Sequence, residues 1–263
     1  MLRLSIIIIS WKMKQMLRDL LVSIRQCTTG MAYEIIIVDN NSQDGTSEMV
    51  EQEFSDARLI RNQENRGVAP ARNQAFRIAL GTYVVTLDAD MQLKENSLLQ
   101  LVEYLDRHPS VGLCGCKLTF PDGSVQPSAR RFPTPLSFLM RRLEFLEWAR
   151  QSASLRYHEM ADWDRSDTRS VDYVIGACQM IRRTAMDHIG LLDEKIFYGP
   201  EDIDYCLRMH RAGWDVVYLA DTAIIHHEQR ITKKNFFSAL MWRHLKGIFY
   251  LFTKYHGTLS YKR

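Results

Sequence analysis

Two carboxylates stand directly after an apolar run in which the sequence predicts a strand. Asp88 and Asp90 form an Asp-Ala-Asp motif behind residues 83–87, YVVTL. Burying two carboxylates so close together is costly unless a cation compensates them. A hard divalent cation takes oxygen ligands and keeps open positions for water or phosphate oxygens. The motif therefore indicates a divalent-cation site, although Asp-x-Asp pairs also occur by chance in solvated turns.

A second polar cluster, DNNSQDGT, follows residues 34–38, EIIIV, in which a buried strand is expected. Asp39 could accept a hydrogen bond from the imide N–H of a uracil or thymine base, or it could simply bond its own turn. Further along, Gly67 and Arg72 lie in the sequence NRGVAPARN. A glycine permits close backbone approach, and an arginine there can neutralise a diphosphate. The alternative is a glycine turn followed by a helix that carries a solvated arginine.

A third acidic cluster, PEDIDYCLR, contains the adjacent residues Glu201 and Asp202. Acidic residues also favour a helix N-terminus for electrostatic reasons alone. Because neighbours on a helix point to different sides, one can be structural while Asp202 faces a cleft as a general base. His226 and His227 follow another apolar run. A neutral histidine can complete a metal site, and His226 is the stronger candidate, although a lone histidine is usually structural.

The elements that position these residues alternate between strand and helix in the first half of the chain. Repeated strand–helix units predict a mostly parallel sheet with helices on both faces, and such a sheet binds ligands beyond the carboxyl ends of its strands. The second half is less regular, and residues 130–170 look like an inserted, mobile segment over the site. Strands are expected at 4–9, 34–38, 58–61, 83–87, 111–119, in a pair within 171–182, and at 216–219 and 223–225; helices at 13–25, 46–53, 69–80, 96–107, 136–150, 201–212 and 235–255.

The composition is that of an ordinary globular protein, with 263 residues, 46% hydrophobic and 25% charged. It excludes collagen-like, low-complexity and fully disordered chains. The five cysteines show no framework spacing, so reduced thiols are expected. The apolar stretch at the start is too short for a signal peptide, and no apolar run is long enough to predict a membrane-spanning helix.

The charge is concentrated at the C-terminal end. Residues 230–263 carry eight basic residues and no acidic ones, although the net charge of the whole chain is only +3. The helix expected at 235–255 has an apolar face, so it either docks on the core or lies on an anionic lipid surface. A nucleic-acid partner is not expected, since acids occupy the positions where a basic groove would be needed.

The ordered set of these motifs resembles the family 2 glycosyltransferases of GT-A fold. It is most similar to the bacterial rhamnosyltransferase-like members that build cell-surface polysaccharides. The resemblance covers residues 4 to about 228. It implies a nucleotide-sugar-binding and catalytic domain at 1–228, followed by a basic amphipathic helical tail at 229–263. The motifs that carry it are IIIIS, VDNNSQDGT, NRGVAPARN, LDAD, GAC, PEDIDYCLR and IIHHE.

The resemblance implies roles for individual residues. Asp39 matches the nucleobase-binding aspartate, and Ser10 matches a position whose backbone lies near the nucleotide. On the same basis Asp202 is the general base and Arg72 lies on the diphosphate side. The implied ligands of Mn²⁺ or Mg²⁺ are Asp90, His226 and Asp88, which also lies near the ribose. The sequence HEQR at 227–230 departs from the small residues and serine expected there.

The implied reaction is the transfer of a sugar, with inversion, from a UDP- or dTDP-sugar to a hydroxyl of a glycan or lipid-linked acceptor. The expected location is cytoplasmic, peripheral at the inner face of the cell membrane, with residues 230–263 on an anionic surface. The alternative is a polyprenyl-phosphate sugar synthase, which shares the nucleotide half but has a phosphate as its acceptor.

Overall fold

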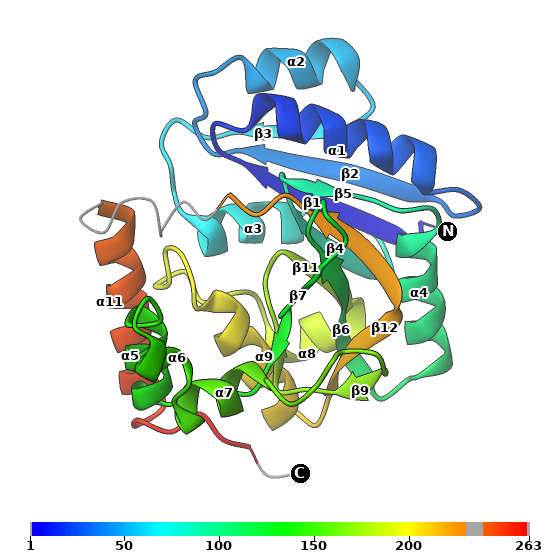
Figure 1. Ribbon diagram of the computed structural model, residues 1–263. Helices are drawn as coiled ribbons and strands as arrows, with labels where there is room; N and C mark the ends of the chain where they lie inside the picture. Colours follow the sequence, from blue (N-terminus) through cyan, green and yellow to red (C-terminus); the bar gives the residue numbers. More distant parts are fainter. Residues whose placement is uncertain (1, 230–238, 262–263) are drawn as a thin grey trace.

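The computed structural model describes residues 2–229 and 239–261, and it forms an α/β architecture around one large mixed sheet (Figure 1). The strand order is β3-β2-β1-β4-β11-β6-β12-β5. Strands β3, β2, β1 and β4 are mutually parallel, and β6 is parallel to β12. Strand β11 runs antiparallel between β4 and β6, so these two halves of the sheet point the same way. The mostly parallel sheet predicted from the alternating pattern is thus confirmed.

Helices cover both faces of this sheet, as predicted. Along β1, Ile6 and Ile8 join one buried cluster and Ile7 joins the other, because successive side chains of a strand point to opposite faces. The first cluster includes the apolar faces of α1, α2 and α4. The second includes those of α3, α8, α9 and the C-terminal helix α11.

The elements of the first half lie close to their predicted positions, except for the short strand β5, which was not predicted. Their bounds are β1 Leu4–Ser10, α1 Lys14–Cys27, β2 Tyr33–Asp39, α2 Thr46–Glu53, β3 Arg58–Arg61, α3 Val68–Phe76, β4 Tyr83–Asp88, β5 Met91–Gln92 and α4 Ser97–Arg107. Helix α3 is shorter than expected. Strands β1, β2 and β4 are recognisable because each is an apolar run that is largely buried on both faces.

The second half departs more from expectation. Its elements are β6 Val111–Thr119, β7 Val125–Gln126, β8 Ala129–Arg130, α5 Pro135–Arg142, α6 Glu147–Arg150, α7 Ala153–Glu159, β9 Arg169–Ser170, β10 Tyr173–Val174, β11 Cys178–Arg182, α8 Arg183–Ile189, α9 Glu201–Arg211, β12 Asp215–His226 and α11 Ala239–Lys254. The single helix predicted at 136–150 is wrong, since α5 and α6 are separate. Their turn contains Leu143, whose amide bonds back to α5.

Two strand predictions also need correction. The strand pair predicted within 171–182 does not form a hairpin, because β10 pairs with β8 whereas β11 pairs with β4 and β6. The two strands predicted at 216–219 and 223–225 are one strand, β12, with a register irregularity between Leu219 and Ala223. The irregularity interrupts the apolar pattern, which is why the sequence reads as two strands.

Helix α11 docks on the body of the protein. Leu251 is fully buried in the second core cluster, and the Lys254 ammonium lies 2.6 Å from Asp204 and 2.8 Å from Asp193. The first residues of the helix predicted at 235–255 are outside the described part of the chain. Five basic residues of the predicted tail also lie outside it: Arg230, Lys233, Lys234, Lys262 and Arg263. Lys254 therefore serves an internal ion-pair network instead of an external anionic surface.

Candidate functional site

Strand register brings the predicted site residues to one edge of the sheet. Ile9 of β1 is paired with Asp88, and Ser10 is paired with Asp39, so both acids flank the carboxyl end of the same strand. His226 arrives from the far end of the chain. The short strand β5, just after the Asp-Ala-Asp motif, pairs with the end of β12 and places His226 opposite Met91.

Asp88, Asp90 and His226 form a group that could hold a metal ion. One ligand atom from each lies within 4.8 Å of the others, and His226 Nε2 is 3.4 Å from Asp90 Oδ1. Burial lowers the pKa of His226, but the hydrogen bond and the charge of Asp90 outweigh it and raise the pKa overall. Two carboxylates and an imidazole form a donor set that suits Mn²⁺ and can also take Mg²⁺. These residues therefore fit the predicted cation.

His226 is oriented by a residue that sequence reasoning missed. Its Nδ1 lies 2.8 Å from Gln126 Oε1, and the Gln126 amide also donates a 3.0 Å bond to the His226 carbonyl. A proton on Nδ1 leaves the Nε2 lone pair free for a metal, as is usual for metal-binding histidines. Gln126 lies on β7, which pairs with the end of β6 after the turn at 120–124. The neighbouring His227 instead contacts Gln92 and lies outside the three-residue group.

Arg72 joins the metal group to the acidic helix α9. Its buried guanidinium donates bonds of 2.9 Å to Asp88 Oδ1 and 2.8 Å to the Gly176 carbonyl, and it lies 3.3 Å from Glu201 Oε1. Burial is also the main reason that the pKa of Asp88 is raised, with Arg72 opposing it. Arg72 is thus a buried cation shared by two carboxylates, not a solvated surface residue.

Glu201 and Asp202 have different partners, although both line the same cavity. Glu201 is buried against Arg72, and its Oε2 has no hydrogen-bond partner within the described part of the chain. Burial and the adjacent Asp202 raise the pKa of Glu201 to about 7. Asp202 faces the open space of the site. Its two oxygens accept bonds of 3.1 Å from the Gly176 amide and 2.8 Å from the Ile203 amide, which fix its orientation.

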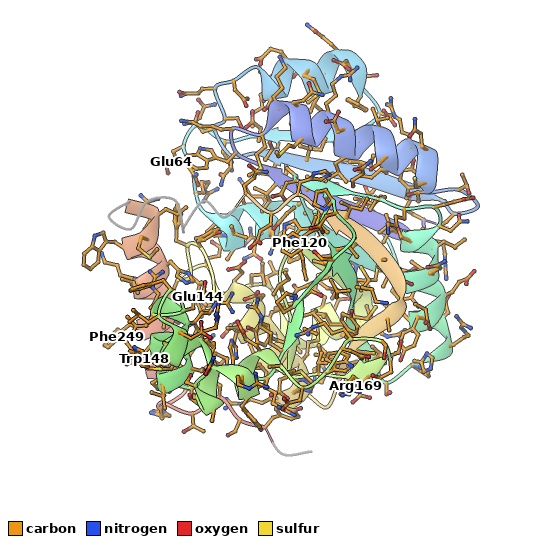
Figure 2. All side chains as sticks on the ribbon, in the orientation of Figure 1. Glu64, Phe120, Glu144, Trp148, Arg169 and Phe249 are labelled. Carbon is orange, nitrogen blue, oxygen red and sulfur yellow. The ribbon has the colours of Figure 1, made fainter. Side chains whose placement is uncertain are left out.

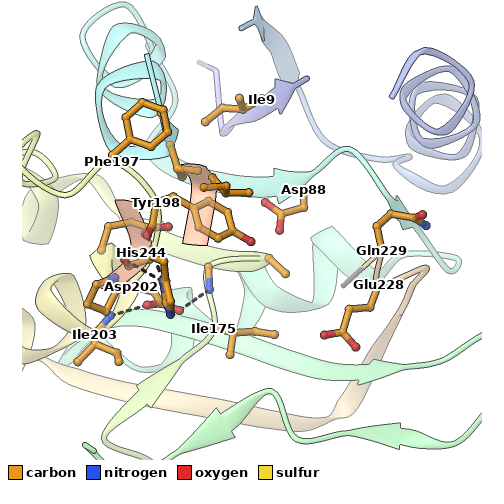
Figure 3. Close-up of a pocket in the computed structure, with 18 of the residues that line it drawn as sticks. Ile9, Asp88, Ile175, Phe197, Tyr198, Asp202, Ile203, Glu228, Gln229 and His244 are labelled. Atoms are coloured by element: carbon orange, nitrogen blue, oxygen red, sulfur yellow. Dashed lines mark hydrogen bonds between the residues drawn. The ribbon is translucent and has the colours of Figure 1, made fainter. Parts of the chain in front are cut away.

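These residues share one cavity of about 430 Å³. Arg72, Asp88, Asp90, Asp202 and His226 all line it, together with residues from the insertion and from α11. Figure 3 shows Asp88, Tyr198, Asp202 and His244 around this space. His244 comes from α11, and its Nδ1 lies 3.2 Å from the Gly199 carbonyl at the start of α9. The C-terminal helix therefore forms part of the wall, which the amphipathic pattern alone did not indicate.

Two predicted nucleotide-side residues do not line this cavity. Asp39 is buried, and its carboxylate accepts a 2.9 Å bond from the Ser42 amide and another from the Ser47 hydroxyl. That is the turn-bonding alternative for an aspartate at this position. Ser10 is buried as well, and its carbonyl accepts the Asn40 amide at 2.9 Å. Their neighbours Ile9, Trp11 and Asn40 do line the cavity, so contact of Asp39 or Ser10 with a nucleotide stays a prediction.

The family model described as "Glycosyl transferase family 2" matches residues 5–190. The chain therefore belongs to glycosyl transferase family 2, as the sequence motifs indicated. Asp202 and His226 lie beyond the matched residues, so their assignment depends on the motifs and on the geometry described above.

Named relatives agree with this family. An N-acetylglucosaminyl-diphospho-decaprenol L-rhamnosyltransferase of Mycobacterium tuberculosis is 28% identical over 235 residues, which cover 85% of this chain and 76% of that protein. A poly-beta-1,6-N-acetyl-D-glucosamine synthase of Staphylococcus aureus is 25% identical over 189 residues, covering 70% of this chain and 40% of that protein. The chain is thus similar to rhamnosyltransferases and to polysaccharide synthases.

Solved structures place the fold among the GT-A glycosyltransferases. GalNAc-T7, determined with UDP, GalNAc and Mn²⁺, superposes with a TM-score of 0.64 at 17% identity, covering 86% of this chain and 44% of that one. The mannosyltransferase PcManGT from Pyrobaculum calidifontis, determined with GDP-Man and Mn²⁺, gives a TM-score of 0.60 at 20% identity, covering 87% of this chain and 58% of that one. The chain spans about half the length of these structural relatives, and at such identities the likeness concerns the fold.

Proposed function

We propose that this glycosyltransferase moves a sugar, with inversion, from a UDP- or dTDP-sugar to a hydroxyl of a lipid-linked or surface glycan. The observation that carries the proposal is the shared cavity, in which the Asp88–Asp90–His226 group and the Asp202 carboxylate both face the same space. The Asp88–Asp90–His226 group can hold the cation that binds the sugar donor. The Asp202 carboxylate can accept the proton of the attacking hydroxyl.

At the donor end, Asp88, Asp90 and His226 would hold Mn²⁺ or Mg²⁺. When bound, such a cation neutralises negative charge on the departing nucleoside diphosphate. The residues of the chain itself do the rest. Arg72 adds a fixed positive charge beside Asp88, and Gln126 fixes the ring of His226. We propose that Asp39 and Ser10 lie on the base and nucleotide side of the donor, next to the cavity-lining Asn40.

At the acceptor end, Asp202 is the proposed general base. A carboxylate offers about four lone-pair positions, and two in Asp202 are taken by backbone amides. The remaining positions can accept the proton of an acceptor hydroxyl as its oxygen attacks the anomeric carbon from the side opposite the leaving group. A base positioned in this way typically contributes about 10²–10⁴-fold to the rate.

The relatives support the kind of acceptor and the pathway class. The mycobacterial relative is named for a decaprenyl-diphosphate-linked acceptor, and the staphylococcal relative is named for polysaccharide synthesis. We therefore propose an acceptor that is lipid-linked and a role in building cell-surface polysaccharide at the cytoplasmic face of the membrane. In the part of the chain that the structure describes, no helix is long and apolar enough to cross a membrane.

An exposed apolar surface supports peripheral binding to that membrane. It lies on α5, α6, the turn between them, and α11 (Figure 1), and the ring of Phe138 in α5 packs against that of Phe252 in α11. Figure 2 labels two of its residues, Trp148 and Phe249. We call this surface the apolar helical face. It consists of Leu136, Leu139, Phe145, Trp148, Trp242, Leu245 and Phe249, all at least 36% exposed. Exposed apolar patches of this kind mark interaction sites, and the basic tail suits anionic lipid.

The proposal is tested by titrating the protein with UDP, dTDP and GDP, with and without Mn²⁺, in a calorimeter. We expect UDP or dTDP to bind at least tenfold more tightly with Mn²⁺ present, because a cation held by Asp88, Asp90 and His226 would offset the negative charge of the diphosphate. Asp90→Asn should remove this dependence. Asp221→Asn, which changes an exposed aspartate on the strand that carries His226, should keep it. Binding that ignores Mn²⁺ in the wild type, or no binding at all, contradicts the proposal.

A further inference from the structure

Three arginines line the part of the cavity wall that β8 and α5 form. They are Arg130, Arg141 and Arg142. The Arg130 Nε donates a 3.0 Å bond to the Pro127 carbonyl, and Arg141 lies 3.8 Å from Glu159. Glu144 also lies close enough to raise the pKa of Arg141. Neither Glu159 nor Glu144 lines the cavity, so the charged groups that β8 and α5 present to it are guanidinium groups.

The guanidinium groups of Arg130 and Arg141 repel each other. Burial lowers the pKa of Arg130, but Tyr173, Glu159 and Asp202 outweigh it and raise that pKa overall. The charge of Arg130 is the largest cause that lowers the pKa of Arg141. The nearby His158 does not add to the charge, because burial and these two arginines lower its pKa to about 3. Like charges held together in a cavity are unfavourable unless an anion compensates them, so this wall favours an anionic ligand.

Asp202 lines the same cavity as this wall and the Asp88–Asp90–His226 group. Its charge contributes to raising the pKa of both Asp88 and Arg130, so it is close to each. The donor phosphates already have the cation group and Arg72. An anion at the arginines is therefore a second one, in the same cavity as the proposed base, which the acceptor must also enter.

The same helices connect the arginine wall with the apolar helical face. Helix α5 places Phe138, Arg141 and Arg142 in the cavity but exposes Leu136 and Leu139. Helix α11 likewise places Leu240, His244 and Ile248 in the cavity while Trp242, Leu245 and Phe249 are exposed. An acceptor that carries phosphate between its sugar and an apolar chain matches this order of surfaces.

We infer that Arg130 and Arg141, together with Arg142, form a subsite for the phosphate groups that join the acceptor sugar to its lipid. The inference rests on the proposed function, since it takes Asp202 as the point where the acceptor hydroxyl reacts. The ligand class is a lipid phosphate or diphosphate that carries a sugar. The subsite itself is a matter of binding, so it is testable without any transfer of sugar.

The first test measures binding of farnesyl diphosphate by calorimetry in EDTA, so that no cation holds it at the acidic end. We expect Arg130→Gln and Arg141→Gln each to weaken binding at least tenfold, because each removes a charge-assisted hydrogen-bond donor. Arg130→Lys, which keeps the charge, should retain more binding than Arg130→Gln. The matched control Arg150→Gln changes an exposed arginine of the same segment and should bind within twofold of wild type. Equal affinity in all variants overturns the inference.

Two further ligands distinguish the source of the phosphate. Inorganic diphosphate should bind at least tenfold more weakly than farnesyl diphosphate if the lipid chain also contacts the protein, and farnesol should bind more weakly still. If inorganic diphosphate binds as tightly as farnesyl diphosphate, the wall is a general anion site and the lipid assignment is wrong.

The second test uses steady-state kinetics with two acceptors, a sugar on a polyprenyl diphosphate and the same sugar on a neutral alkyl chain. For the diphosphate acceptor, Arg130→Gln should raise KM at least tenfold while the KM of the donor stays the same. For the neutral acceptor the substitution should change nothing. A raised donor KM would assign the arginines to the nucleotide instead. If no acceptor reacts but arginine-dependent binding of farnesyl diphosphate persists, the proposed function fails and the subsite stands.

Discussion

His226 Nε2 lies 3.4 Å from Asp90 Oδ1, although the two residues are separated by more than half of the chain. The contact exists because β5 pairs with the end of β12, and the amide of His227 donates a 2.9 Å bond to the Asp90 carbonyl. The backbone therefore fixes the spacing of two candidate metal ligands before any cation binds.

Gln126 should control metal affinity through His226. We expect Gln126→Leu to weaken Mn²⁺ binding about 10–100-fold, because the imidazole loses the bond that fixes its ring and its proton. The matched control is Gln92→Leu, which removes the partner of the neighbouring His227 and should leave Mn²⁺ affinity within twofold. Calorimetric titration with Mn²⁺ measures both. Equal affinities in the two variants would show that Gln126 does not orient a ligand.

Glu201 should make stability depend on pH. Because burial raises its pKa from 4.5 to about 7, the folded chain binds more protons than the unfolded chain between those values. Stability contributed by this residue is therefore lost as pH rises through that window, by at most about 3 kcal/mol. Urea unfolding at pH 5 and pH 7.5 should show a smaller decrease in Glu201→Gln than in wild type. The control Glu95→Gln, at an exposed position, should show the same decrease in unfolding free energy as wild type. An unchanged decrease in Glu201→Gln contradicts the assignment.

Leu251 should report on the docking of α11. Its side chain is fully buried, so Leu251→Ala is expected to cost about 2–5 kcal/mol of unfolding free energy. Leu245→Ala on the same helix removes a side chain that is 36% exposed and should cost less than about 1 kcal/mol. Denaturant titration gives both values. If the two substitutions cost the same, α11 is not part of the folded core.

The apolar helical face should mediate binding to anionic membranes. The double variant Trp242→Ser and Phe249→Ser removes side chains that are 60% and 74% exposed, and we expect at least tenfold weaker binding to phosphatidylglycerol vesicles. Leu80→Ser is the control, since Leu80 is 72% exposed and lies outside this face. Co-sedimentation measures the affinity. If the wild type, the double variant and Leu80→Ser bind vesicles equally well, the apolar helical face does not mediate membrane binding.

The sequence predicts the parallel strands of the sheet, and the position of Asp88 and Asp90 at the end of one of them, because these signals are local. Buried apolar runs mark the first strands, and the polar residues that follow them, such as Asp88 and Asp90, must lie at strand ends. Gln126 and the arginine wall have no such signal. They reach the cavity through the pairing of short strands and through the separate helices α5 and α11, whose contacts are decided by tertiary packing.

Asp39 shows the opposite case, in which a clear motif does not fix the geometry. Its position at the end of β2 is as expected, but its carboxylate is bonded to Ser42 and Ser47 in the following turn. A hydrogen bond from a nucleobase and hydrogen bonds from the turn satisfy a buried carboxylate equally well. The residue type and its spacing therefore do not predict which of the two Asp39 makes.

The most direct measurement is the effect of Asp202→Asn on two quantities in the same preparation, donor affinity and turnover. An amide fills the same space but cannot take up the acceptor proton. We predict that UDP- or dTDP-sugar affinity stays within twofold of wild type while turnover falls at least about 10²-fold. Turnover near that of wild type would contradict a base at Asp202. That result would favour the alternative, a polyprenyl-phosphate sugar synthase, because a phosphate acceptor needs no general base.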